Sequence, residues 1–414
     1  MRGAELMNIP NVFKDLLVLD FSRYLPGGYA TQPFADWGSE VIKVEDTDQG
    51  DFCRHDPPTR YGISYYSTAL CRNKKSVSLN LKDREARECC LKLASRADVI
   101  VESFRPGVTR RLGIDYETIS KINNKIIYAS ISAYGQDDSR SQRALHDGAL
   151  IAETGFLDLV DDNAFPLPLA DLATAMVTGQ SLLASLLNRE KTGEGAYIDI
   201  SMFDCFLWWQ SMIDSRWLFN GGKHKRADLE YPSVGYNLYE TSDGARLMFA
   251  MIEPKFWVPF TEEIGMSELK GDCRKRKWEA PDSFVKMEHF VKSKTLDEWE
   301  EWLSSRTEYS ITPVLTKEEA IPKIIKREPS MLNYVDFKDV GRVLQTNIPH
   351  HISSLPTQIS HFKEASRLGQ DTKDILLQLG VSHEGLREME IRGAVKLDTP
   401  VDHSYMDKNP VAPE

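Results

Sequence analysis

The sequence predicts an α/β fold in which a parallel sheet forms a large domain and a smaller α+β domain follows. Short apolar runs alternate with stretches of helical periodicity through the first two hundred of the 414 residues, as in sheets covered by helices on both faces. The pattern changes near residue 222, where Gly221-Gly222 precedes the basic residues Lys223, Lys225 and Arg226. Glycines beside a charged run indicate a linker.

The first βαβ unit is the clearest local signal. Residues 16–20 (LLVLD) are a continuous apolar run, which is typical of a buried parallel strand. A helical stretch follows Gly27-Gly28 and ends at Gly38, and residues 41–45 (VIKVE) form the next strand.

The later elements follow the same alternation. We expect strands at 77–81, 99–101, 126–131 and 198–200, and helices at 84–94, at 171–189 and from 202 onward. In the smaller domain, runs 236–240 and 246–250 flank Ser242-Asp243-Gly244 as in a hairpin, and short helices follow at 256–263, 284–292 and 296–303. The predicted domains are 1–221 and 222–335, with 336–414 returning to the large domain and resuming helix after residue 371.

Composition narrows the function classes. The net charge of −11 disfavours a nucleic-acid-binding protein, which needs a basic face. The most apolar stretch, 172–187, is shorter than a membrane span requires and carries polar residues. Six cysteines without a Cys-x-x-Cys pair and nine histidines without His-x-x-x-His spacing predict neither a disulfide framework nor a metal site. The N-terminus lacks a signal-peptide core, so we expect a cytoplasmic protein with neither a membrane nor a nucleic-acid partner.

Two basic segments suit a phosphorylated ligand with a flat base. Asn73, Lys74 and Lys75 precede a strand, and a loop from Ser103 to Gly107 follows one, with Arg110-Arg111 just beyond. Loops after strand ends collect ligands in open α/β sheets. For any single lysine or arginine among them, solvated surface charge is the better interpretation. Gly-x-Gly-x-x-Gly and Gly-x-Ser-x-Gly are absent, which disfavours a nicotinamide enzyme and an α/β-hydrolase.

Asp171 is the most unusual carboxylate. It stands in the apolar segment 168–173 (PLADLA), where a buried-looking helix begins. A carboxylate there gains from the positive end of the helix dipole. Pattern alone favours a plain N-cap for Asp171.

Several spaced motifs carry a resemblance to a known family. They are LDFSR at 19–23, ADWGSEVIKVE at 35–45, RNKKSVSLNLK at 72–82, ADVIVESFRPG at 97–107, TGEG at 192–195 and LGQDT at 368–372. In this order they resemble the class III CoA-transferases, which include formyl-CoA, carnitine and bile-acid CoA-transferases and the α-methylacyl-CoA racemases. The resemblance covers nearly the whole chain.

The resemblance implies a fold, an assembly and a site. It implies a Rossmann-like large domain, a small domain and an interlocked homodimer. It places Asp171 on the catalytic aspartate and implies acyl-CoA and carboxylic acid substrates, with CoA a substrate rather than a resident cofactor. The residues that it places in CoA-binding segments are Arg23, Asn73, Lys74, Lys75, Phe104, Arg111, Tyr134 and Gly135.

The resemblance leaves the reaction open. A transferase uses Asp171 as a nucleophile on the thioester. The segment around Glu253 and the pair His146-Asp147 instead resemble the racemase branch, in which His146, Asp171 and Glu253 would move the α-proton. Because residues 172–175 (LATA) lack the glycines usual in racemases, we favour the transferase. A non-catalytic CoA-binding subunit is a remote third alternative.

Overall fold

The chain folds into two compact units. In this computed structural model the described residues are 12–160, 167–222, 232–349, 352–353 and 362–398. One unit combines Met1–Arg216 with Glu328–Glu414, and the other is Trp217–Arg327. The chain leaves the large unit after Arg216 and returns to it at Glu328, whereas the predicted domain boundaries are at residues 221 and 335. Residues 223–231 of the predicted linker lie outside the described residues.

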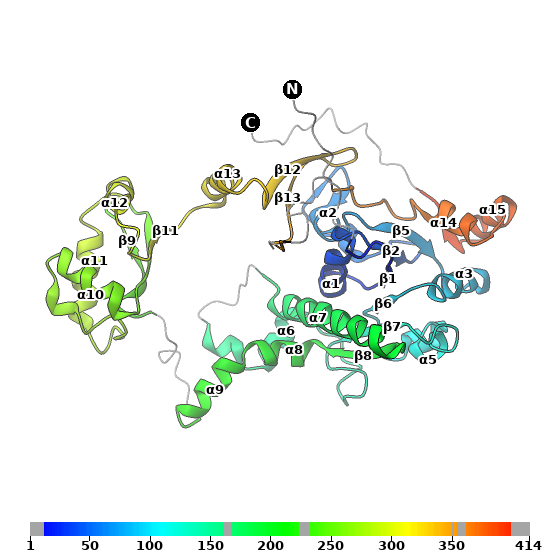
Figure 1. Cartoon of the computed structure of the whole chain (residues 1–414), viewed down its shortest axis with the longest axis horizontal. Coiled ribbons are helices and arrows are strands. Elements are labelled where there is room, and N and C mark those ends of the chain that lie inside the picture. Colours follow the sequence, from blue (N-terminus) through cyan, green and yellow to red (C-terminus); the bar gives the residue numbers. More distant parts are fainter. Residues whose placement is uncertain (1–11, 161–166, 223–231, 350–351, 354–361, 399–414) are drawn as a thin grey trace. The chain divides into compact units, whose positions relative to one another are not determined.

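A seven-stranded sheet forms the centre of the large unit (Figure 1). Its order is β14-β5-β2-β1-β6-β7-β8, and β14 alone among these runs antiparallel, pairing with β5. The bounds are β1 Leu17–Phe21, β2 Glu40–Glu45, β5 Lys75–Leu79, β6 Val99–Glu102, β7 Ile127–Ser132, β8 Ala196–Ser201 and β14 Val395–Lys396. The predicted α/β class with a parallel sheet is confirmed, and the C-terminal segment supplies the edge strand.

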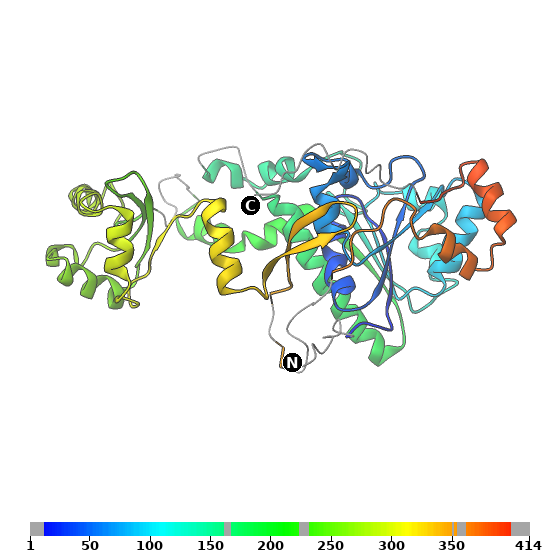
Figure 2. The same ribbon diagram turned by 90° about the horizontal axis from the view of Figure 1, so that it is seen from above.

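Helices cover both faces of this sheet. One core joins the sheet to α3 (Arg84–Ala94), α14 (Thr372–Gln378) and α15 (His383–Ile391). The other joins it to α1 (Leu25–Asp36), α6 (Asp147–Glu153), α7 (Leu169–Thr192) and α8 (Met202–Trp209). Figure 2 shows α14 and α15 near one end of the sheet. The apolar runs in the strands are continuous because both faces are buried.

A buried ionic network crosses the central strands. Asp20 lies in β1 with no exposed side-chain surface, and its carboxylate faces Lys43 of β2 at 3.8 Å and Lys74 at 3.1 Å. Lys74 also donates to the Gly28 carbonyl and to Thr31 of α1. The two lysines hold the pKa of Asp20 below its usual range against the effect of burial, which would raise it.

Smaller elements complete the large unit. They are η1 (Phe52–Arg54), β3 (Thr59–Arg60), β4 (Ile63–Ser64), α2 (Tyr65–Leu70), α4 (Val108–Leu112), α5 (Tyr116–Ile119), η2 (Phe156–Leu159), α9 (Ser211–Phe219), β12 (Leu332–Phe337) and β13 (Gly341–Thr346). The unit boundary falls inside α9. Strands β12 and β13 form an antiparallel hairpin, so the predicted domain boundary at residue 335 falls inside a strand.

The second unit has its own core. Strands β9 (Tyr236–Glu240), β10 (Arg246–Ala250) and β11 (Ile311–Pro313) form its sheet. Its helices are α10 (Pro254–Glu263), η4 (Ser267–Leu269), α11 (Pro281–Val291), α12 (Leu296–Leu303) and α13 (Lys317–Arg327). Phe249, Trp257, Phe260 and Trp299 are fully buried between these elements. The predicted hairpin and α12 match the observed bounds.

Helix α7 is longer than the sequence pattern indicated. It has 24 residues, so the argument that this stretch is too short for a membrane span is wrong. Among the described helices it alone passes a test of length and mean hydropathy for a span. Its buried side chains, such as Ala173 and Leu182, pack in the core with the sheet and with α8. A core helix of a globular domain has the same features.

The buried network predicts that two adjacent lysines differ sharply in their effect on stability. Removing Lys74 leaves Asp20 buried with one cation fewer, so Lys74→Ala should lower the free energy of unfolding by about 3–5 kcal/mol. Lys75→Ala, which breaks only a half-exposed pair with Glu40, should cost less than about 1 kcal/mol. Urea denaturation followed by circular dichroism measures both, and equal effects would contradict the assignment.

Candidate active site

Asp171 lies at the start of α7 but does not cap it. It is the third residue of the helix, whose N-cap position is Pro168. The cap comes from α6: Oδ1 of Asp147 accepts the backbone N–H groups of Ala170 at 2.6 Å and Asp171 at 3.0 Å. The N-cap reading of Asp171 is therefore wrong, and its carboxylate is free of that task.

The Asp171 carboxylate is partly buried and unpaired. None of the residues that the structure describes donates a hydrogen bond to it or forms an ion pair with it. Burial, and secondarily the negative charge of Asp147, raise the pKa of Asp171 to about 7. This carboxyl group changes charge near neutral pH, as is common for groups that act in catalysis.

Aromatic and apolar side chains pack against Leu172, the residue that follows Asp171. Leu172 packs against a buried cluster of Leu25, Cys53, Leu70 and Cys71, together with Tyr24 and Tyr66. Burial, with smaller contributions from Tyr65 and Asp171, raises the pKa of Tyr66. The Tyr66 phenol therefore stays neutral near the Asp171 carboxylate.

His146 lies in the same region as Asp171. It occupies the N-cap position of α6, directly before Asp147, and its side chain is exposed. Its ring meets the ring of Tyr24 edge to face at 6.3 Å. The N-terminal ends of α6 and α7 are thus joined through Asp147, which brings two of the three predicted catalytic residues together.

Glu253 belongs to the second unit. It occupies the N-cap position of α10 and forms an exposed ion pair with Lys255 at 3.3 Å. Its predicted role beside Asp171 stays a prediction.

Arg23 and Phe104 lie where an open α/β sheet binds ligands. Arg23 follows β1 and Phe104 follows β6, and the strand order reverses between these neighbours. The Arg23 guanidinium lies 4.8 Å from the Phe52 ring centroid and 5.9 Å from that of Phe104, and it pairs with Asp46 at 2.9 Å. Arg111 lies in the last turn of α4, exposed and without a partner among the described residues.

The segment from Asn73 to Lys75 does not fit the CoA role that the sequence indicated. It lies at the amino end of β5, whereas the loop of Phe104 follows the carboxyl end of β6. The two segments therefore lie at opposite ends of the parallel strands. The Lys74 ammonium group donates its three hydrogen bonds to Asp20, the Gly28 carbonyl and Thr31, which leaves none for a ligand. Asn73 donates to Asp36 and accepts from the Lys363 backbone, while Lys75 pairs with Glu40.

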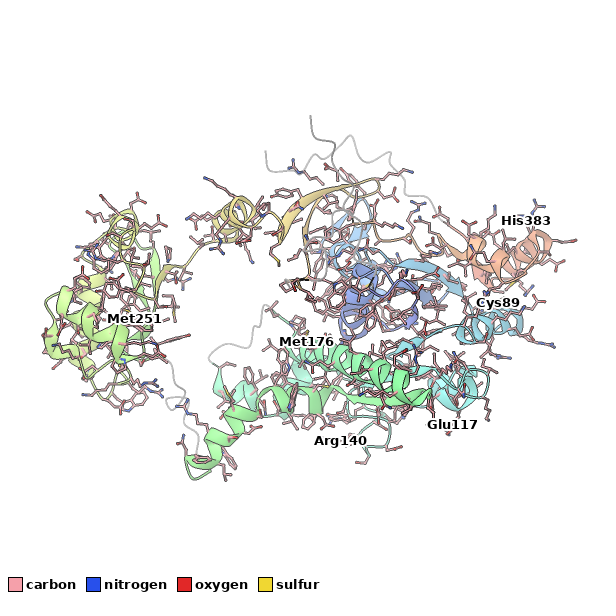
Figure 3. All side chains as sticks on the ribbon, in the orientation of Figure 1. Cys89, Glu117, Arg140, Met176, Met251 and His383 are labelled. Carbon is pink, nitrogen blue, oxygen red and sulfur yellow. The ribbon has the colours of Figure 1, made fainter. Side chains whose placement is uncertain are left out.

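Tyr134 and Gly135 follow β7 and line a cavity of about 540 Å³. The Tyr134 hydroxyl donates to Glu153, and the Arg140 guanidinium lies 4.0 Å from the ring centroid. Arg140 is labelled in Figure 3. The cavity walls include four aspartates, which are Asp137, Asp138, Asp199 and Asp204. These charges disfavour CoA phosphates inside the cavity.

Sequence reasoning missed three contributors to the site. Tyr24 and Tyr66 gave no motif signal, because single aromatic residues in loops and short helices have no periodicity to mark them. Asp147 was noticed only as the neighbour of His146, although it caps α7 and acts on the Asp171 charge. All six cysteines are free and buried, and the described residues contain no cluster of three or more typical metal ligands.

Comparison with known proteins identifies the family. The model of CoA-transferase family III matches residues 13–372. The chain belongs to CoA-transferase family III. It resembles succinyl-CoA:glutarate CoA-transferase of Mus musculus, with 34% identity over 63% of this chain and 61% of the relative. It also resembles α-methylacyl-CoA racemase of Mus musculus, with 27% identity over 94% of this chain and 98% of the relative.

The fold of this chain is also similar to that of solved structures. The Rv3272 protein of Mycobacterium tuberculosis superposes with a TM-score of 0.74 and 25% identity, covering 89% of this chain and 100% of that protein. The matches to curated CoA-transferases span 53% to 69% of those relatives' own lengths. This family III chain therefore shares its fold with a solved structure, and its relatives include both CoA-transferases and racemases.

The raised pKa of Asp171 predicts a pH-dependent gain in stability on its removal. Because its pKa is 3.8 when unfolded and about 7 when folded, ionisation disfavours the folded state progressively as pH rises across that window. Asp171→Asn should therefore melt at a higher temperature than wild type at pH 8, with a gain that shrinks towards pH 5. Asp137→Asn controls for the loss of one charge, and a gain independent of pH would contradict the shift.

Proposed function

We propose that this family III protein is a CoA-transferase that moves CoA from an acyl-CoA to a carboxylic acid, with Asp171 as the nucleophile. The observation that carries the proposal is the free, partly buried Asp171 carboxylate at the N-terminus of α7. A nucleophilic carboxylate has to be unpaired and shielded from bulk water. Asp171 is so placed, on the crossover helix between β7 and β8, while Arg23 and Phe104 offer a cation and an aromatic face at the switch point.

The reaction follows from that carboxylate. Its oxygen attacks the thioester carbonyl carbon, the carbon–sulfur bond breaks, and CoA leaves as a thiolate while a mixed anhydride forms on Asp171. The thiolate attacks the Asp171 carbonyl and releases the donor acid. The acceptor carboxylate then attacks the carbonyl carbon of this aspartyl thioester, expelling the CoA thiolate and forming a second mixed anhydride. The thiolate attacks the acceptor's carbonyl carbon, which gives the new acyl-CoA and frees the Asp171 carboxylate. Each attack by Asp171 requires the ionised form, which predominates above about pH 7.

A racemase is the second candidate, and two observations favour it. The racemase likeness extends over 94% of the chain, whereas the likeness to the succinyl-CoA:glutarate CoA-transferase covers 63%. His146 stands at the N-terminus of α6, beside Asp147, which caps the helix of Asp171. A histidine and a carboxyl group that titrates near neutral pH are suited to removing and returning an α-proton.

Trapping of the intermediate distinguishes the two reactions. Wild-type protein incubated with an acyl-CoA and no acceptor should carry a hydroxylamine-sensitive adduct on the peptide of Asp171, detected by mass spectrometry, and Asp171→Asn should carry none. His146→Ala should keep CoA exchange, because a nucleophilic Asp171 does not need that base. A screen of acyl-CoA donors against carboxylic acids, run in parallel, tests the substrate class.

The opposite result is equally measurable. A racemase forms no adduct and exchanges the α-proton of a 2-methylacyl-CoA for deuterium in heavy water. In that case His146→Ala should slow the exchange by about 10²–10⁴-fold, as expected for the loss of a general base. Deuterium uptake without CoA transfer would overturn the transferase assignment.

We also propose that the chain forms a homodimer. Helices α7 and α8 pack on each other and, with the start of α9, expose large apolar side chains. These are Met176, Leu183, Leu187, Trp208, Trp209 and Met212. Met176 is labelled on α7 in Figure 3. Exposed apolar side chains on packed helices are typical of interaction surfaces. The cytoplasmic location remains a prediction from the sequence.

Light scattering and dilution test this assembly. If the chains interlock, the dimer should persist at nanomolar concentration and separate only when the protein unfolds. Mass photometry gives the mass at that dilution, and circular dichroism reports whether structure is retained. A folded monomer would contradict the proposal.

A further inference from the structure

Strands β6, β7 and β8 carry, near their carboxyl ends, a row of polar side chains that the proposed reaction does not use. Glu102 of β6 pairs in register with Ser130 of β7, and Ser130 pairs with Asp199 of β8. Residues directly opposite on neighbouring strands point to the same face of a sheet. The row therefore lies at the carboxyl edge of the sheet, next to the loops of the candidate site.

Each end of this row holds one of those loops. Oε2 of Glu102 accepts the backbone N–H of Phe104 at 2.7 Å. Oδ2 of Asp199 accepts the backbone N–H of Gln136 at 2.9 Å, directly after Tyr134-Gly135. The Ser103 hydroxyl oxygen, between Glu102 and Phe104, accepts the Arg23 N–H at 2.9 Å. The backbones that carry Arg23 and Phe104 are thus fixed through one short segment.

Glu102 is an unusual residue for this position. Only 2% of it is exposed, and the structure records no ion pair for it among the described residues. A buried carboxylate is costly unless hydrogen bonds or a cation satisfy it. The Phe104 amide supplies a hydrogen bond at 2.7 Å, and the Ser130 hydroxyl, opposite Glu102 on β7, acts on the carboxyl group in the direction that lowers its pKa. Leu or Val would fill the same space at lower cost.

We propose that Glu102 is a positioning residue for acyl-CoA: braced by Ser130, its carboxylate fixes the Phe104 backbone and so orients the ring that, with Arg23, receives the CoA moiety. That the ligand is acyl-CoA rests on the proposed function. The hydrogen bond by which Glu102 fixes the Phe104 backbone is independent of that function, because it is present in the protein without ligand.

The same geometry makes the hold on Phe104 sensitive to pH. Burial raises the pKa of Glu102 to about 7, and the nearby charge of Asp199 adds to this, while Ser130 and the Phe104 amide oppose it. The phenols of Tyr128 and Tyr197 also face it. An ionised carboxylate accepts a hydrogen bond more strongly than a neutral carboxyl group. Affinity for CoA should therefore fall as the pH is lowered through 7.

Calorimetric titration with CoA at pH 6 and pH 8 tests this dependence. Glu102→Gln keeps the shape and an acceptor oxygen but stays neutral, so at pH 8 it should bind CoA on the order of tenfold more weakly than wild type. At pH 6 the two proteins should bind alike. Because CoA titrates identically with both proteins, the difference between them isolates the contribution of Glu102. Glu117→Gln, an exposed change on α5 (labelled in Figure 3), is the matched control and should follow wild type.

Hydrogen exchange supplies a readout that needs no ligand. The Phe104 amide should lose protection in Glu102→Gln at pH 8 and match wild type at pH 6. Ser130→Ala provides a second variant, since losing the brace should raise the pKa of Glu102 and move the midpoint of the pH dependence upward.

The experiments distinguish a failure of the positioning role of Glu102 from a failure of the proposed function. If CoA binds and the affinities of wild type and Glu102→Gln agree at both pH values, the positioning role is overturned. If wild type does not bind CoA, the proposed function fails, while Phe104 protection still decides whether Glu102 holds the loop. Equal protection in both proteins at pH 8 would overturn that hold.

Discussion

The burial of Asp20 between two lysines is the constraint on which the rest of the large unit depends. A carboxylate inside a parallel sheet is tolerated only when cations and hydrogen bonds compensate for lost hydration. Lys43 reaches it from β2, and Lys74 reaches it from the segment before β5 while also bonding α1. Three strands and a helix are thereby fixed around one charge. Apolar side chains alone would not specify this register, because neighbouring apolar residues can replace one another.

This network extends to the candidate site. Lys43 also pairs with Asp51 at 2.7 Å, and Oδ1 of Asp51 accepts the backbone N–H groups of Tyr24 and Cys53. Tyr24 has a positive φ of 58°, an unfavourable conformation for a residue with a side chain. It is held there by Asp51, with its ring against His146. The buried ion pairs therefore also fix the position of Tyr24, which contacts His146 in the candidate site.

The sequence predicted the fold where periodicity was strong. The βαβ unit, α3 and the β9–β10 hairpin emerged with nearly their observed bounds because each has a clear period and a clear end signal. Asp171 was also found, but its environment was not. The dipole of α7 lowers a nearby carboxyl pKa by less than about one unit, whereas burial and Asp147 raise it by about three, to about 7. Burial depends on tertiary packing, which a single sequence does not reveal.

The error over Lys74 has the same origin. A basic segment next to a strand looks the same in the sequence whether it lies at the amino or the carboxyl ends of the strands. Only the sheet topology shows which of these ends faces the ligand. Lys74 lies at the amino ends of the strands and turns inward to Asp20, while Arg23 and Phe104 lie at the carboxyl ends. The strand at 332–337 was missed because its partner, β13, follows a turn that no motif marks.

The two candidate reactions require different parts of the protein. A nucleophilic transferase needs the Asp171 carboxylate and the CoA loops, all of which the large unit supplies. A racemase in the form that the resemblance implies also needs Glu253, which belongs to the second unit. The pKa near 7 serves either reaction, because a carboxyl group poised at that value can attack when ionised or return a proton when neutral. The pKa of Asp171 is therefore set by residues of the large unit, and the two proposed reactions differ in whether they also require Glu253 of the second unit.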